Sequence, residues 1–352
     1  MKTKIAGMLV LLLVILAGGG YYIYSERTDV LILNGYLGGE KTGLFEDEEI
    51  KKILKKDYQI EFQYQRAGSL DMVTAEQAGR DYLFPSSQTA LEYYQETYGK
   101  PASDEIIFNT PIVLYSHRTV VDALKTCGVV TEKEGICYAD MKKLVELIEK
   151  DTTWSDVGIP ELYGSLSVDT TDPVKSNSGN MFAALIANVL NDGNTVDTVS
   201  VNRILPRLKR IFGKTGYMEN SSSDLFNQFL RMGVGAKPLI AGYESQLLEY
   251  AAENPEEYDK IKEDIVMIYP TPTMWSTHIY IALDEDGKKG SRALSDEKIQ
   301  KLAWEKHGFR TSSYDISSTG GEGKVSGVCK QPESVMNMPG YKAMKRIMEG
   351  LE

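Results

Sequence analysis

Short apolar runs alternate with helical patterns along most of the chain. Extended apolar segments predict strands, several of them followed by a sequence of helical type. These predicted strands cover residues 29–33, 58–65, 82–84, 110–115, 162–168, 237–243, 265–269 and 279–283. Strands that alternate with helices are typical of an α/β fold with a mainly parallel sheet. The segments near 110–115 and 278–283 predict two extended crossings that join two α/β units.

The clearest helical pattern covers residues 182–190. Its apolar side chains recur at i, i+3, i+4, i+7 and i+8, the spacing of one buried helical face: Phe182, Leu185, Ile186, Val189 and Leu190. A polar loop over 171–181, rich in Ser, Asn and Gly, precedes this face. Such a loop at a helix start offers N–H groups and hydroxyls to a small anion or polar solute. Alternatively, Ser176, Asn177 or Ser178 only caps the helix. Further helices are predicted over 201–212, 224–232 and 295–309, with a last one ending at 348.

The N-terminus differs in kind from the rest of the chain. Lys2 and Lys4 precede an uncharged apolar run over residues 5–24, which is long enough to cross a lipid bilayer as a helix. Residues 1–28 are therefore predicted to be a signal anchor or a cleaved signal peptide. The tyrosines at 21, 22 and 24 favour the uncleaved transmembrane anchor, since aromatic residues gather at membrane interfaces. In both cases the remainder is expected outside the cytoplasmic membrane.

Composition narrows the function classes. The chain has 352 residues, of which 42% are hydrophobic and 25% charged, and this suits a globular protein of two lobes. A net charge of −11 argues against a nucleic-acid partner. The three histidines have no metal-site spacing, so neither a metal nor a cofactor is expected. Cys127 and Cys137 either form a local disulfide, leaving Cys329 unpaired, or all three cysteines are free thiols.

One arrangement recurs along the chain: a strand ends, a turn bearing Ser or Asn follows, and a helix begins. In open α/β sheets, ligands bind outside the carboxyl ends of the strands, where these turns lie. Helix N-termini at such an edge carry partial positive charge and free N–H donors. The candidate ligand-binding residues are Asn34, Gly35, Ser69, Ser86, Ser87, Asn177, Ser178, Gly179, Ser221, Ser222 and Tyr243.

Four segments carry a resemblance to a known family. They are Ala67-Gly68-Ser69, the run from Thr171-Asp172-Pro173 to Ser178-Gly179, Gly242-Tyr243-Glu244-Ser245, and the run from Trp304 to Arg310. With the order of strands and helices, they resemble the type II periplasmic-type solute-binding proteins, and most of all the molybdate- and sulfate-binding branch. The resemblance implies two lobes, each with a mainly parallel sheet, around a ligand cleft. Lobe 1 would comprise residues 29–112 and 278–352, and lobe 2 residues 113–277.

The resemblance also implies roles for individual residues. Ser69 would donate its hydroxyl and backbone N–H to the ligand, with Asn34 and Gly35 beside it after the first strand. Ser178 would offer a backbone N–H from the other lobe, and Tyr243 its phenol hydroxyl. Ser221 or Ser222 would add a further donor.

Three charged residues depart from the family pattern. Glu40 and Glu244 would repel an anion near the cleft. Arg66 would compensate for them, or would bind a carboxylate in a larger ligand.

The expected function follows from this reading. The protein would capture a small polar ligand, an oxyanion or another small anion, pass it to an ABC-type membrane permease, and perform no chemistry. One alternative is a membrane-anchored sensing or interaction module without a transporter. Another is an enzyme on the same scaffold, because a fold does not fix a function.

Overall fold

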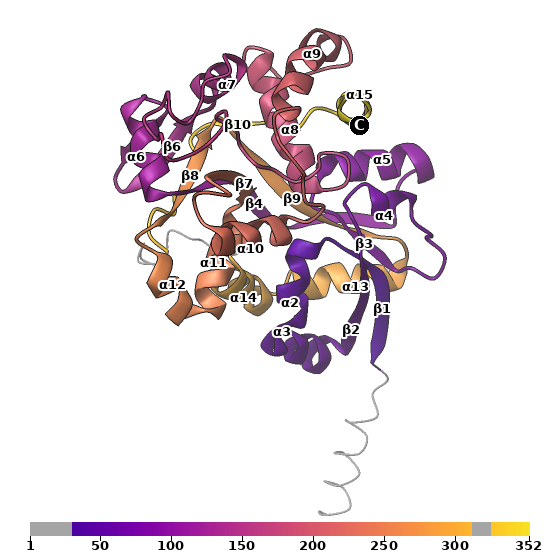
Figure 1. Cartoon of the computed structure of the whole chain (residues 1–352). Coiled ribbons are helices and arrows are strands. Elements are labelled where there is room, and N and C mark those ends of the chain that lie inside the picture. The colour runs from indigo at the N-terminus through magenta and orange to yellow at the C-terminus, as the bar shows by residue number, and fades with distance from the viewer. Residues whose placement is uncertain (1–29, 312–324) are drawn as a thin grey trace, which may run out of the picture.

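Two long strands cross the middle of the molecule in the computed structural model, which describes residues 30–311 and 325–352 (Figure 1). They are β4 (Ser103–His117) and β9 (Thr273–Ala282), and they pair antiparallel from Ser103 opposite Ala282 to Pro111 opposite Trp275. The first half of β4 adjoins β9, whereas its second half pairs with β7 and β8. The two predicted crossings are therefore confirmed as neighbouring strands that join two lobes.

The other strands extend the sheet on both sides of this pair. They are β1 (Leu31–Leu37), β2 (Ile60–Arg66), β3 (Tyr82–Phe84), β5 (Val130–Lys133), β6 (Ile136–Asp140), β7 (Leu239–Tyr243), β8 (Ile265–Thr271) and β10 (Val335–Met336). Their order is β2-β1-β3-β9-β4-β8-β6-β5, with β7 on β4 and β10 on β9. The prediction of mainly parallel sheets is wrong. Among the strand pairs of the described residues, β1–β2, β1–β3, β6–β8 and β9–β10 are parallel and the others antiparallel, because β4 and β9 run antiparallel to each other and to most of their neighbours.

Helices cover both faces of the sheet (Figure 1). Those before the second lobe are α2 (Thr42–Glu46), α3 (Glu48–Ile53), α4 (Asp71–Thr74) and α5 (Gln88–Tyr98), with the short turns η1 (Gly39–Lys41) and η2 (Leu54–Tyr58). The next are α6 (Arg118–Thr126), α7 (Met141–Glu149), α8 (Asn177–Leu190), α9 (Ser200–Phe212), α10 (Ser222–Met232), α11 (Glu244–Glu253) and α12 (Pro255–Ile261). The chain ends with α13 (Glu285–Leu294), α14 (Glu297–His307) and α15 (Tyr341–Leu351).

Most of the predicted elements are confirmed, and one strand is wrong. The apolar face at 182–190 lies on α8, which is buried on nearly all sides. The predicted strand over 162–168 is an irregular segment with one isolated bridge, Thr153 to Ser165. Leu162, Leu166 and Val168 are buried there, as a strand pattern requires. However, the segment hydrogen-bonds to a neighbouring loop, where Leu166 N–H donates to Thr152 O, and forms no strand ladder.

Separate cores support the two lobes. Side chains of β1, α2, α3, β3 and α14 form one core, around Leu33, Phe84 and Ala303. A second, larger core surrounds α8, and a third lies between α10, α11 and β8. The lobes are thus packed bodies that share the β4–β9 pair.

Two other predictions concern the N-terminus and the cysteines. Across 30–311 and 325–352, no helix is long and apolar enough to cross a membrane, and the predicted span at 5–24 lies outside these residues. The disulfide alternative is wrong, because Cys127, Cys137 and Cys329 are all free. Cys137 is buried in the core around α8, whereas Cys127 is exposed at the end of α6 with its Sγ facing Val157 O. The other alternative, three free thiols, is the one that the structure shows.

Candidate functional site

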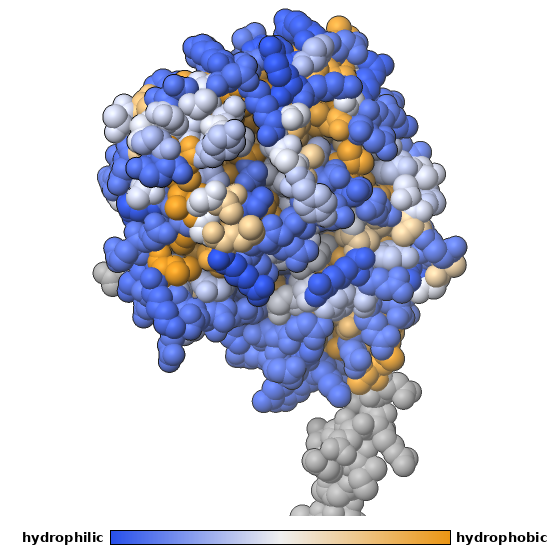
Figure 2. All heavy atoms as spheres, in the orientation of Figure 1, coloured by the Kyte–Doolittle hydropathy of each residue, from blue (hydrophilic) through white to orange (hydrophobic). Residues whose placement is uncertain are grey.

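A cavity of about 470 Å³ lies between the two lobes. Its wall on the first lobe comes from the ends of β1 and β2: Gly38, Gly39, Glu40, Arg66, Ala67, Gly68, Ser69 and Asp71. Its wall on the second lobe comes from the starts of α8 and α10 and the end of β7: Lys175, Ser176, Asn177, Asn220, Ser221, Ser222, Ser223, Asp224 and Tyr243. The face that carries α2, α4 and α10 is largely hydrophilic (Figure 2).

The structure brings five of the eleven predicted residues to this cavity. They are Ser69, Asn177, Ser221, Ser222 and Tyr243. The other six do not line it: Asn34, Gly35, Ser86, Ser87, Ser178 and Gly179. Ser86 and Ser178 nevertheless touch residues that do, whereas Ser87 is buried at the start of α5.

Asn34 and Gly35 do not follow the first strand, as predicted, but lie inside it. They sit opposite Gln63 and Tyr64, because β1 continues through buried Tyr36 to Leu37. Asn34 N–H donates to Asp81 Oδ2 at 2.6 Å. The turn that reaches the cavity begins instead at Gly38, four residues beyond Asn34. The sequence pattern did not predict the turn at Gly38, because Asn-Gly is normally a turn signal. Here the Asn34-Gly35 pair lies in a strand that is paired with β2 on one side and with β3 on the other.

The polar loop before Phe182 is largely helix, since α8 begins at Asn177. Asn177 Nδ2 donates to Ser86 O across the lobe boundary and to Tyr243 Oη, both at 2.9 Å. Ser178 Oγ is 2.7 Å from Thr171 Oγ1, so its hydroxyl is occupied behind the cavity wall. Gly179 is a packing position, because a Cβ there would lie 2.1 Å from Thr171 O.

The start of α10 forms the opposite part of the second-lobe wall. Ser221 Oγ accepts a hydrogen bond from Asp224 N–H at 3.4 Å and caps the helix. Gln246 fixes this wall to β7: its Nε2 donates to Ser222 O, and its Oε1 accepts from Tyr243 N–H, both at 2.8 Å. The Tyr243 side chain is therefore held beside Asn177. Burial, and then the charge of Glu40, raises the pKa of Tyr243, so its hydroxyl stays protonated.

Behind the first-lobe wall lies a buried polar cluster of Glu40, Lys41, Ser86 and His278. Lys41 Nζ pairs with Glu40 Oε1 and donates to Ser86 Oγ at 2.7 Å. Nδ1 of His278 lies 3.1 Å from the same Oγ. Ser86 N–H in turn donates to Ser69 Oγ at 2.9 Å, which links the cluster to the cavity.

The charge of Lys41 opposes the effect of burial on the pKa of Glu40 and adds to its effect on the pKa of His278. Burial alone would raise the pKa of Glu40, but the charge of Lys41 and its hydrogen bonds hold it at about 2. Burial lowers the pKa of His278 well below its usual range, and Lys41 lowers it further, so the imidazole is neutral at pH 7. Glu40, with a side chain 10% exposed, therefore presents an ionised carboxylate at the cavity.

The remaining charges of the cavity wall are mixed. Arg66 and Lys175 are basic, while Asp71 and Asp224 are acidic. Arg66 is exposed and forms no ion pair within the described ranges, whereas Lys175 Nζ lies 3.6 Å from Asp172 Oδ2. Burial raises the pKa of Asp71. With the Glu40–Lys41 and Lys175–Asp172 pairs counted as neutral, Arg66 faces Asp71 and Asp224, so the wall lacks the positive excess that would attract a multivalent anion.

Glu244 does not repel an anion here, because it lies outside the cavity wall. It is fully buried and accepts from Arg310 Nε and Nη2, both at 2.6 Å. Tyr269 also donates its hydroxyl to Glu244. Both the Gly-Tyr-Glu-Ser segment and the late Gly-Phe-Arg segment thus contribute to one buried ion pair. Their part in the site is to hold the start of α11 behind Tyr243.

Several wall residues were not among those predicted from the sequence, including Gly38, Gly39, Asp71, Lys175 and Asn220. Two of these residues lie close in sequence to residues that were predicted. Asp71 follows Ser69 by two residues, and Asn220 precedes the three serines at α10. Only the fold shows that these turns face each other.

Comparison with known proteins supports the fold. No family model and no curated protein matches the chain. A periplasmic thiamin-binding protein is 11% identical with a TM-score of 0.63, over 91% of this chain and 96% of its own. The sulfate-binding protein SubI from Mycobacterium tuberculosis H37Rv is 13% identical with a TM-score of 0.53, over 82% and 88%.

A third similar structure is the periplasmic binding protein AfuA from Actinobacillus pleuropneumoniae, with fructose 6-phosphate bound. It is 14% identical with a TM-score of 0.55, over 92% of this chain and 97% of its own. The three matches cover between 82% and 92% of this chain. The chain has the fold of the type II periplasmic solute-binding proteins.

Proposed function

We propose that the protein is an extracytoplasmic solute-binding protein that captures a polar ligand between its lobes and delivers it to an ABC-type permease. The observation that carries this proposal is the cavity itself, whose walls come from both lobes, with the hydrogen bond from Asn177 on one wall to Ser86 behind the other joining the lobes beside it. A ligand held by both walls stabilises their approach, as in hinge closure around ligands. The lobes would meet within β4 near residue 112 and within β9 near residue 277.

The size of the cavity favours an organic ligand over a bare oxyanion. Its volume of about 470 Å³ falls in the range of small-molecule sites. It would hold roughly fifteen waters at about 30 Å³ each, so a bare oxyanion would leave most of it filled with solvent. The oxyanion expected from the sequence fits better as one group of a larger molecule, such as a phosphate or carboxylate.

The chemistry of the wall gives each part of such a ligand a partner. An anionic group fits the Arg66 guanidinium, the Lys175 ammonium and the N–H groups at the start of α8. Hydroxyls or an amine fit the Glu40 carboxylate and the Asn177 and Tyr243 side chains. We therefore favour a phosphorylated or carboxylated polyhydroxy compound, or a zwitterion. By their names, proteins of similar fold bind thiamin, sulfate and fructose 6-phosphate, so the fold alone does not choose among these classes.

A thermal-shift screen of the full-length protein tests this function. Its arms are inorganic oxyanions, sugar phosphates, organic acids and amino acids. A ligand that binds only the folded state raises the unfolding midpoint by mass action, by about 4 °C at a hundredfold excess over Kd for a chain of this size. Ser69→Ala and Tyr243→Phe should each weaken the hit, and Ser200→Ala, outside the cavity, should not. A response confined to oxyanions would refute the ligand class, and no response in any arm would refute the binding function.

The location is part of the proposal. Residues 5–24 would anchor the protein to the membrane or direct its export, with the lobes outside. Fractionation of expressing cells with an antibody to the lobes tests this. Protein found in the cytoplasmic fraction would refute it.

A further inference from the structure

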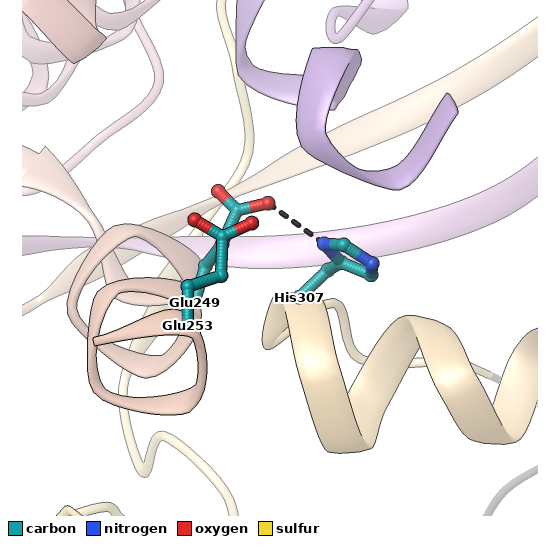
Figure 3. A group of neighbouring side chains, drawn as sticks. All are labelled: Glu249, Glu253 and His307. Carbon is teal, nitrogen blue, oxygen red and sulfur yellow. Dashed lines mark hydrogen bonds and ion pairs between the residues drawn. The ribbon is translucent and has the colours of Figure 1, made fainter. Parts of the chain in front are cut away.

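Three ligand-type side chains converge away from the cavity. Glu249 and Glu253 project from α11, and His307 comes from the end of α14 (Figure 3). One ligand atom of each lies within 4.8 Å of the other two. His307 Nδ1 faces Glu249 Oε1 at 2.7 Å. The two glutamates are one helical turn apart, so their carboxylates lie on the same face of α11.

His307 is unusual for its burial. Its side chain is 2% exposed, and within the described residues its Nε2 has no hydrogen-bond partner. That nitrogen faces Asp47 Oδ2 at 3.6 Å, on the side of the ring opposite Glu249. The imidazole thus lies between carboxylates on both sides. Metal-binding histidines have this arrangement, with a carboxylate behind the ring that fixes its orientation.

Within the described residues, the carboxylates around His307 outnumber the lysines that pair with them. Asp47, Glu249 and Glu253 supply three negative charges, and Lys306 pairs both with Asp47, at 3.0 Å, and with Glu49, at 2.9 Å. Glu249 approaches the backbone of α2 so closely that a Cβ on Gly43 would lie 2.2 Å from its Oε1. Helix packing therefore holds the carboxylates together although they repel each other. A divalent cation would remove this repulsion.

We propose that Glu249, Glu253 and His307 bind a divalent cation of the zinc class. One imidazole nitrogen and two carboxylate oxygens form a ligand set typical of zinc, whereas calcium and magnesium prefer oxygen alone. An ion between His307 Nδ1 and Glu249 Oε1 requires these atoms to separate to roughly 3.3 Å, for tetrahedral bonds of about 2.0 Å. Glu253 is exposed, which gives the ion an entry path and leaves a position for water.

This cation would join the two lobes. Helix α11 buries Leu247 and Ala251 in the core beside β8, and α14 buries Ile299 and Ala303 in the core beside β1. The site therefore connects elements of separate cores. Tyr243, which lines the cavity, directly precedes α11. Metal binding is thus expected to stabilise the contact between α11 and α14, whether or not the cavity holds a solute.

Zinc titration of the full-length, untagged protein, freed of metal with a chelator, tests the site. Calorimetry should show one equivalent of Zn²⁺ bound, and a hundredfold excess over Kd should raise the unfolding midpoint by about 4 °C. Ca²⁺ and Mg²⁺ should produce much smaller shifts. The solute screen described above is run separately, so failure of one proposal leaves the other standing.

Variants distinguish this site from adventitious binding. Glu253→Gln alters an exposed side chain and should weaken Zn²⁺ binding at least tenfold without unfolding the protein. Glu256→Gln makes the same change at an exposed position of α12 and should bind like the wild type. Zn²⁺ binding that is absent, or equal in Glu253→Gln and wild type, overturns the proposal. An equal response to Ca²⁺ overturns the role of His307.

Discussion

Replacing Glu40 by Gln would test the electrostatics behind the cavity wall. The change keeps the shape of the side chain but removes the charge that neutralises Lys41, whose side chain is fully buried. Burial lowers the pKa of Lys41, and Glu40 offsets part of this effect. Without its partner, Lys41 must remain as an unpaired buried charge or lose its proton. Either outcome costs free energy in the folded state alone.

The magnitude follows from the pKa of Glu40. A fall from 4.5 to about 2 in the folded protein corresponds to a stabilisation of about 3 kcal/mol at neutral pH. This is an upper value, because it includes attraction to a charged His278, whereas burial keeps that imidazole neutral. Since the folded pKa lies below the unfolded one, the contribution is complete above pH 4.5. It is lost as the pH falls from about 4.5 to about 2.

Urea unfolding followed by tryptophan fluorescence measures this effect. At pH 7, Glu40→Gln should lower the free energy of unfolding by about 2–3 kcal/mol, and the difference from wild type should shrink between pH 4.5 and pH 2. The double variant Glu40→Gln with Lys41→Met should regain most of the loss, because it removes both charges. A single variant as stable as the wild type at pH 7, or a double variant with the summed losses, would refute the reasoning.

Three further predictions concern residues outside the cavity wall. Arg310→Met leaves Glu244 buried without its counter-ion and should lower the free energy of unfolding by about 3–5 kcal/mol, as measured by urea unfolding. Gly179→Ala places a methyl group against Thr171 O and should destabilise the protein by about 1–3 kcal/mol in the same assay; an unchanged midpoint would contradict the close packing of α8. Of the three thiols, only exposed Cys127 should react with a thiol reagent in the native protein, and rapid reaction of a second would contradict the burial of the others.

The local elements were largely predictable from sequence, for identifiable reasons. The apolar face from Phe182 to Leu190 has helical spacing, and the segment over 82–84 is a short apolar run between an aspartate and a Pro-Ser-Ser turn. Each pattern reflects burial of one element against a core. The segment over 162–168 misled because buried side chains can alternate in an irregular chain that packs on a core without strand partners. The sequence pattern also could not predict whether neighbouring strands run parallel or antiparallel, since this depends on pairing between segments far apart in the chain.

The candidate site was predictable in part. Ser69, Asn177 and Tyr243 were selected because a polar residue follows a strand or starts a helix, and the fold brings them to one cavity. The Asn34-Gly35 pair also has the polar and small residues of a turn, but it lies within β1. The strand continues because the apolar residues Tyr36 and Leu37 follow the pair and join the pairing with β2. Ion pairs between residues far apart in sequence, such as Glu244 with Arg310, leave no local signal. The partner that neutralises Glu244 could therefore be found only in three dimensions.

Asn177 connects the two lobes, and its removal tests whether ligand capture depends on their closure. Its Nδ2 donates to Ser86 O in the first lobe, and Ser86 N–H donates to Ser69 Oγ at the cavity. Asn177→Ala removes one hydrogen bond between the lobes, the one at the cavity, but no core packing, so it should favour an open form. Small-angle scattering of the ligand-free protein should then show a larger radius of gyration than in the wild type.

The matched control lies on the same helix. Asn180 Nδ2 donates to Pro173 O at 3.3 Å, a contact within the second lobe, so Asn180→Ala should leave the radius of gyration unchanged. A ligand identified by thermal shift should restore the compact form of Asn177→Ala at higher concentration, because binding energy compensates for the missing hydrogen bond. If both variants scatter like the wild type and bind the ligand equally well, the hydrogen bond does not control closure. The lobes are then held together by β4, β9 and the other contacts between them, such as Glu244 with Arg310 and Glu249 with His307, and the cavity is a preformed site rather than a cleft that closes.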